Sequence, residues 1–409
     1  MRIPDSFRSV RLLFDVGFLA MLRVVAIVIG LAYVKIYTNR LPPDALGIFF
    51  YLGTLSYLLN ALLFVPFDFY LQAYCSRAGE RLPVGPVARM TAGVLAAALI
   101  LVAAIGAILV ALGQLAILDI VSLYIVAVLL FGCISLRNLL NNRGHRRIVA
   151  GALVFEAAGR VCAFVSLILF LTPSGRLLFA SAGIALFLEL IGLAIYAAIR
   201  LQWATDATPP ASPALIPATA PVSVSAACNL VQLQAYRTMY PWAGNPAPAA
   251  IFAVVANVGS AGMSAVGQIF AQILLPRIYQ SQGTYIRHYI RWALLLTLAV
   301  AAFAWIAAPM LVAFITSPQY SAHAELMVFG VLLEGANVIV SAVTVGSMLK
   351  DDTRRLMVWN IAGAVVGAAG YAVALTIAPA SPAAIGLALL LSQVVVLGGL
   401  GLNARRRNS

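Results

Sequence analysis

Apolar runs long enough to cross a lipid bilayer recur along the whole chain, and they constrain the fold more than any other feature. A helix of about 20 apolar residues spans the hydrocarbon core, which is about 30 Å thick. Hydrophobic residues make up 63% of the 409 residues and charged residues 10%, whereas a soluble domain carries about 25% charged residues. Because lipid satisfies no backbone hydrogen bonds, runs of this kind form helices. The sequence therefore predicts an all-α, polytopic membrane protein.

The pattern predicts about twelve transmembrane helices in two sets of six. The predicted spans cover approximately residues 13–37, 45–70, 87–112, 114–136, 148–171, 177–199, 218–240, 249–279, 289–315, 322–350, 356–377 and 383–402. Residues 202–217 are rich in proline, alanine and polar residues, a composition typical of a semi-rigid, unstructured connector. We therefore predict an N-terminal six-helix half at 1–201, a cytoplasmic linker at 202–217 and a C-terminal six-helix half at 218–409.

The positions of the basic residues test this topology independently of hydropathy. Of the 26 Lys and Arg residues, twenty fall in predicted inner segments, two in predicted outer turns and four within spans. Cytoplasmic loops of membrane proteins carry an excess of Lys and Arg. The distribution predicts that both termini are cytoplasmic.

Charge, cysteine usage and motif content argue against several other classes of protein function. The net charge of +13 does not indicate nucleic-acid binding, because the cations lie in short turns between apolar runs rather than on one soluble face. The four cysteines form no C-x-x-C and do not pair with the histidines, so we predict neither a disulfide nor a metal site. No phosphate-binding loop and no H-E-x-x-H motif is present. We expect no cofactor and no catalysis.

Three cations within predicted spans are candidate substrate-binding residues: Arg23 and Lys35 on the first span and Arg237 on the seventh. A cation near the middle of a membrane helix is expensive, so it usually faces a cavity lined by protein. The alternative is that Arg23 and Lys35 extend to the two membrane surfaces. A faint internal repeat makes Lys35 and Arg237 near-equivalents, since each precedes an aromatic residue, a proline-rich turn and an Ile-Phe pair.

Acidic residues within predicted spans are candidates for coupling or for structural ion pairs. Glu156 and Arg160 are four residues apart with the acid first, which places both on one helical face. Glu189 and Glu334 lie among aliphatic residues near the middle of their spans. Each is either protonated, paired with Arg23, Arg160 or Arg237, or part of a proton or ion pathway.

The eighth span carries a polar stripe at helical spacing. Its members include Asn257, Ser260 and Gln268. The stripe could line a passage for a hydroxyl-rich substrate, with Asn257 and Gln268 as binding residues, or it could serve hydrogen bonding between packed helices. Gly363 and Gly367, in a G-x-x-x-G pattern, indicate a packing notch.

The segment YVKIYTNRLPPDALGIFFYLGTLSYLLNALL, the basic NNRGHRRI before the fifth span and the six-plus-six arrangement together resemble one transporter group. This is the multidrug/oligosaccharidyl-lipid/polysaccharide (MOP) exporter superfamily, whose fold is of the MATE type. The nearest resemblance is to its polysaccharide-exporter branch of Wzx-like O-antigen flippases. The resemblance implies transport of undecaprenyl-pyrophosphate-linked glycan from the inner to the outer leaflet of the bacterial inner membrane by alternating access. It also implies that Arg23, an arginine in the first span, meets the pyrophosphate.

The first functional hypothesis is therefore a glycolipid flippase whose partners are that lipid-linked glycan, membrane lipids and other envelope glycan-assembly proteins, with no nucleic acid. The alternative is a cation-coupled multidrug exporter of the same superfamily, in which acids would dominate the cavity. A membrane glycan polymerase or glycosyltransferase would be expected to have a long outer loop, and the sequence shows none. A scaffold role in envelope assembly is a further alternative.

Overall fold

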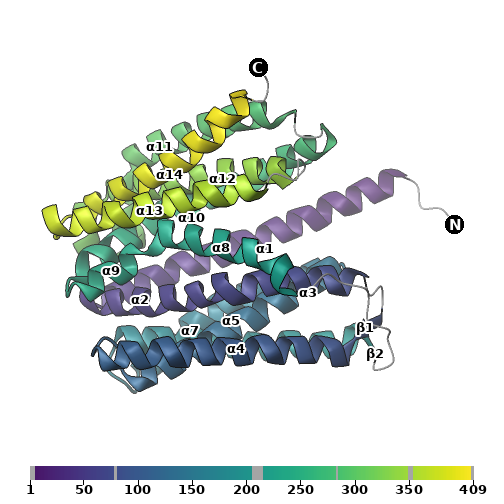
Figure 1. The fold of residues 1–409 in the computed structure, drawn as a ribbon, viewed down its shortest axis with the longest axis horizontal. Coiled ribbons are helices and arrows are strands. Elements are labelled where there is room, and N and C mark those ends of the chain that lie inside the picture. The colour runs from purple at the N-terminus through teal and green to yellow at the C-terminus, as the bar shows by residue number, and fades with distance from the viewer. Residues whose placement is uncertain (1–4, 78–80, 205–214, 282–283, 349–352, 407–409) are drawn as a thin grey trace. The chain divides into compact units, whose positions relative to one another are not determined.

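The computed structural model describes residues 5–77, 81–204, 215–281, 284–348 and 353–406, and it is almost entirely helical (Figure 1). Its α-helices are α1 (Asp5–Arg40), α2 (Pro43–Leu59), α3 (Val65–Arg77), α4 (Val84–Ala111), α5 (Ile117–Asn142), α6 (Arg146–Ile168), α7 (Gly175–Arg200), α8 (Leu215–Gln234), α9 (Tyr236–Trp242), α10 (Pro246–Gln280), α11 (Ile286–Ile315), α12 (Leu326–Met348), α13 (Thr353–Ile377) and α14 (Pro382–Arg406). A π-helical turn, η1 (Asn60–Phe64), joins α2 to α3, and a 3-10 helix, η2 (Pro318–His323), precedes α12. The predicted all-α fold is confirmed.

Eleven helices of the described residues are long and apolar enough to cross a membrane. Each coincides with one of the predicted spans. The remaining predicted span, the seventh at residues 218–240, corresponds to α8 and α9, which are not among the eleven. The protein is therefore a multi-pass, all-helical membrane protein.

The chain forms two compact units, which we call the first and the second unit. The first unit comprises Met1–Ile36 and Leu63–Leu215, and the second comprises Tyr37–Leu62 and Ile216–Ser409. In the first unit α7 packs against α5 and α6. In the second unit α10 and α11 pack against α12, while α13 and α14 lie side by side (Figure 1).

Glycines follow the ends of two helices, and a serine side chain caps the start of a third. Gly144 and Gly244 follow the ends of α5 and α9 with left-handed φ angles of 86° and 75°, a conformation that glycine adopts without the penalty of a Cβ atom. At the start of α7 the Ser174 hydroxyl accepts a hydrogen bond from the backbone N–H of Leu177 at 3.2 Å. This contact satisfies one of the unpaired donors of the first turn.

The predicted connector at 202–217 is partly structured. Gln202–Ala204 form strand β2, which pairs in parallel with β1 (Arg81–Pro83) in the register Arg81 to Gln202. The end of the connector is also structured, because α8 begins at Leu215. The prediction of an unstructured connector was therefore wrong at both ends, and residues 205–214 lie outside the described residues. Composition missed the strand because three residues are too few for an alternating pattern.

The π-helical turn η1 interrupts a long helix between α2 and α3. The Asn60 side chain donates a hydrogen bond to the carbonyl oxygen of Ser56 at 3.0 Å, and Pro66, just beyond the turn, has no N–H to donate. The turn includes the boundary between the two units, which falls between Leu62 and Leu63. Single π turns of this kind often mark functional positions in helices.

Candidate functional site

Four charged side chains form one ion-pair cluster inside the first unit. Arg137 on α5 donates to both carboxylate oxygens of Glu189 on α7, with 2.6 Å between Nε and Oε1, and it also donates to Glu156 on α6. Glu156 accepts in addition from Arg160, one turn further along α6. The Glu189 side chain is only 1% exposed, whereas that of Arg160 is 29% exposed. Two cations and two anions therefore hold three helices together without net charge.

The cluster corrects two expectations from the sequence. The fourth span was expected to end at Leu136, with Arg137 in an inner loop, but α5 continues to Asn142. Arg137, not one of the three cations considered before, is therefore the ion-pair partner of Glu189. The apolar residues Leu139 and Leu140, both buried, continue the helical pattern beyond Leu136 and could have revealed the longer helix. The predicted pairing of Glu156 with Arg160 is present.

Two buried acids of the first unit, Asp119 and Asp68, were not among the site residues predicted from the sequence. Asp119, 3% exposed, pairs with the exposed Arg176, with 2.7 Å between Oδ1 and Nε. Asp68, 4% exposed, accepts hydrogen bonds from the side-chain amides of Asn138 at 2.7 Å and Gln72 at 3.0 Å. Buried carboxylates need such donors because an unpaired buried charge is costly. Both acids therefore stabilise the contact between neighbouring helices.

Arg23 and Lys35 lie on α1 and belong to the first unit. Arg23 is exposed on the surface of this unit, and Lys35 is half-buried. Arg237 belongs to the second unit, so the expected meeting of the three cations in one cavity stays a prediction. Both residues of α1 lie in a helix that is apolar enough to span a membrane.

Arg237 is the centre of a polar and aromatic site in the second unit. Its guanidinium carbon lies 5.0 Å from the centre of the Phe50 ring and 5.5 Å from that of Tyr236. Its Nε donates to the Tyr236 hydroxyl at 2.9 Å, and its Nη2 donates to Asn257 Oδ1 at 3.4 Å. In the part of the chain that the structure describes, no carboxylate contacts this guanidinium. The site therefore retains a positive charge that can accept an anion.

The polar stripe on α10 serves two different purposes. Asn257 is exposed and contacts Arg237, whereas Ser260 donates to Glu334 on α12 at 3.4 Å. Glu334 accepts a second hydrogen bond from Asn337 at 3.4 Å. The side chain of Gln268 lies outside the described residues. The structure therefore brings together two of the predicted binding residues, Arg237 and Asn257.

Glycines on α10 and α12 allow the two helices to approach closely. An added Cβ at Gly259 would lie 2.0 Å from the carbonyl oxygen of Met327, and one at Gly330 would lie 1.8 Å from that of Ala256. An added Cβ at Gly262 would meet nothing within 4 Å, so Gly262 does not take part in this close contact. On α13, Gly363 forms the expected packing notch, because a Cβ added at this position would lie 2.5 Å from the Val396 side chain.

The fold agrees with that of solved MATE transporters. The inward-facing conformation of a multidrug resistance MATE family transporter of the MOP superfamily matches with a TM-score of 0.60 and 16% identity, over 95% of this chain and 98% of that chain. An outward-facing conformation of such a transporter matches with a TM-score of 0.62 and 15% identity, over 95% of this chain and 93% of that chain. The chain therefore has the MATE-type fold of a polytopic membrane protein.

A third similar structure is a MOP superfamily transporter from Pyrococcus furiosus, in which reverse polarity of the binding pocket suggests a different function. It matches with a TM-score of 0.50 and 14% identity, over 95% of this chain and 93% of that chain. No protein-family model and no curated protein matches the sequence.

Proposed function

We propose that the protein is a flippase that moves a lipid-linked oligosaccharide or polysaccharide precursor from the inner to the outer leaflet of the bacterial inner membrane. The MATE-type fold supports a transporter of the MOP superfamily as the general class. Inward-facing and outward-facing conformations are both known for similar folds, which supports an alternating-access cycle. In this proposal both termini are cytoplasmic, and other envelope glycan-assembly proteins supply and receive the glycan.

The observation that carries the proposal is the positive charge of the Arg237 site. The guanidinium lies against two aromatic rings and beside an amide, and no carboxylate of the described residues neutralises it. A guanidinium binds a phosphate group through two parallel hydrogen bonds. Arg237 would therefore hold one phosphate of a pyrophosphate, with Asn257 free to contact an adjacent sugar hydroxyl once the guanidinium turns to the anion.

The distribution of acids supports the same substrate class. Glu156 and Glu189 are occupied by Arg137 and Arg160, so these acids are not available to attract a cationic drug. Arg23 and Lys35 add positive charge on α1. The Pyrococcus furiosus transporter, with its reversed pocket polarity, is a precedent for a different charge preference on this fold.

The proposal can be tested by measuring translocation in proteoliposomes loaded with a fluorescent undecaprenyl-pyrophosphate-linked glycan. Arg237→Ala should reduce the rate at least tenfold, and Arg237→Lys should restore part of it because Lys keeps the charge without the planar fork. Arg277→Ala is the matched control, because Arg277 also lies over a tyrosine ring, that of Tyr285, at 5.9 Å, but is exposed near the end of α10. A rate in Arg237→Ala equal to that of the control would refute the role of Arg237.

A cation-coupled multidrug exporter is the second candidate. Two observations favour it: the similar structures include multidrug resistance transporters, and among the described residues Glu334 accepts hydrogen bonds from the neutral side chains of Ser260 and Asn337. This function predicts that Glu334→Gln abolishes proton- or sodium-driven efflux of cationic dyes from vesicles, while Arg237→Ala has little effect. Dye efflux without glycan translocation would decide for this second function.

A further inference from the structure

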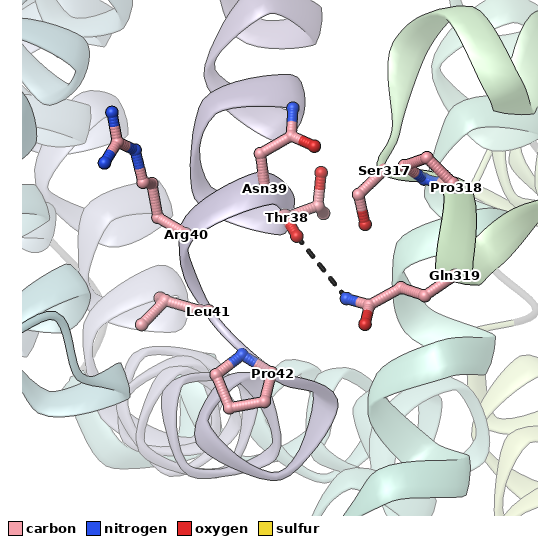
Figure 2. A pocket seen from close by; sticks show the side chains of 8 residues that line it. All are labelled: Thr38, Asn39, Arg40, Leu41, Pro42, Ser317, Pro318 and Gln319. Atoms are coloured by element: carbon pink, nitrogen blue, oxygen red, sulfur yellow. Dashed lines mark hydrogen bonds between the residues drawn. The ribbon is translucent and has the colours of Figure 1, made fainter.

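A pocket in the second unit lies apart from the Arg237 site and has no role in the functions described above. It has a volume of about 370 Å³ and is lined by Thr38–Pro42, at the turn from α1 to α2, and by Ser317–Gln319, at the start of η2 (Figure 2). The Gln319 side-chain amide donates to the backbone carbonyl of Thr38 at 3.4 Å and connects the two segments. Both segments belong to predicted outer turns, so the pocket would open on the side to which the glycan is delivered.

One buried hydroxyl in this pocket lacks a hydrogen-bond partner. Ser317 is 5% exposed, and its Oγ contacts no donor or acceptor of the described residues. A buried polar atom without a partner is unfavourable, and native proteins satisfy nearly all such atoms by protein, water or ligand. The Ser317 and Gln319 side chains point toward the end of α1 (Figure 2). Because Ser317 lines the pocket, a ligand held there would lie beside this hydroxyl, and a rotation of the Ser317 side chain would bring the two into contact.

The lining favours a neutral ligand with several hydroxyl groups. Hydroxyl and amide side chains from Thr38, Asn39, Ser317 and Gln319 offer both donors and acceptors. The Arg40 side chain points away from Ser317 and Gln319 (Figure 2), so its charge does not dominate the pocket. The volume corresponds to about a dozen water molecules, which suits a single sugar ring rather than an oligosaccharide.

We infer that this pocket binds one neutral sugar ring of the transported glycan on the outer side of the protein. The inference rests on the proposed flippase function for the origin of the sugar, but not for the binding itself. Ser317 would exchange hydrogen bonds with a ring hydroxyl, and the Gln319 amide would contact the neighbouring hydroxyl. The pocket would thereby hold the glycan on the delivery side and oppose its return.

Saturation-transfer NMR on the purified protein in detergent tests the binding step. The probes are glucose, galactose, mannose and N-acetylglucosamine, with inorganic phosphate as an anionic control. We expect saturable binding of at least one sugar, weakened about two- to tenfold by Ser317→Ala, which removes one hydrogen bond. Ser381→Ala, the same change in another predicted outer turn, should leave binding unchanged.

The outcomes separate this inference from the proposed function. Sugar binding that is insensitive to Ser317→Ala, or the absence of saturable binding, would overturn the sugar site and indicate that only water satisfies Ser317. Phosphate binding that Arg40→Gln abolishes would instead show a simple anion site. Inhibition of glycan translocation by the bound sugar, lost in Ser317→Ala, would support the link to transport. Sugar binding in a protein that translocates no glycan would leave the pocket standing and refute its link to the flippase function.

Discussion

Replacing Arg137 by methionine removes the guanidinium that joins Glu156 and Glu189 and keeps an extended side chain in its place. Glu156 retains its contact with Arg160, so the variant leaves Glu189, whose side chain is 1% exposed, as a buried carboxylate without its ion-pair partner. Removing one partner of a buried ion pair costs about 3–5 kcal/mol. At about 2–4 °C per kcal/mol for a domain of 150–250 residues, the melting temperature should fall by roughly 6–20 °C.

The assay is thermal unfolding of the purified protein in one detergent, followed by tryptophan fluorescence. A double variant, Arg137→Met with Glu189→Gln, also removes the orphaned charge and should recover most of the loss, because neutral replacement of a buried ion pair is often tolerated. Arg146→Met, an exposed arginine at the start of α6, is the control and should change stability by less than about 0.5 kcal/mol. The cluster would not stabilise the protein in this way if Arg137→Met had the same melting temperature as the control. The same conclusion would follow if the double variant were no more stable than the single one.

Two further changes test other contacts. Exchanging Glu156 and Arg160 should lower the amount of protein in the membrane, measured by quantitative immunoblotting, because the exchange places an arginine against the guanidinium on α5; an unchanged amount would argue against the four-residue cluster. Gly259→Ala should destabilise the protein by about 1–3 kcal/mol, because its Cβ would lie 2.0 Å from the Met327 carbonyl oxygen. Gly262→Ala, which meets nothing within 4 Å, should be neutral or slightly stabilising, and equal melting temperatures of the two variants would contradict the close helix contact.

The sequence predicted most of the fold because the bilayer imposes a length and a polarity on every spanning helix. Such constraints act on each segment separately and can be read without knowledge of its neighbours. Helix ends were less predictable, and Arg137 shows the reason. A charged residue ends an apolar run but does not end a helix when its charge is neutralised inside the protein, as Glu189 neutralises Arg137.

The candidate site was predictable only in part. The i,i+4 spacing of Glu156 and Arg160 lies within one helix, so the sequence alone contains that contact. The contact of Arg237 with Phe50 joins residues that are distant along the chain, and the partner of Glu189 lies on a different helix. Pairing between helices depends on their packing, which hydropathy does not specify.

The π-helical turn at Asn60–Phe64 determines where the helix that contains it can lose a residue. A π turn closes its hydrogen-bonded ring with one residue more than an α turn. Deletion of a single residue here would convert the turn to ordinary α-helix and leave the buried faces of α2 and α3 in phase. The same deletion elsewhere between Pro43 and Arg77 would rotate one face by about 100° and expose residues such as Leu52 or Phe67, now 1% and 2% exposed. Along this helix, the π turn is therefore the place where the loss of one residue disturbs the interior least.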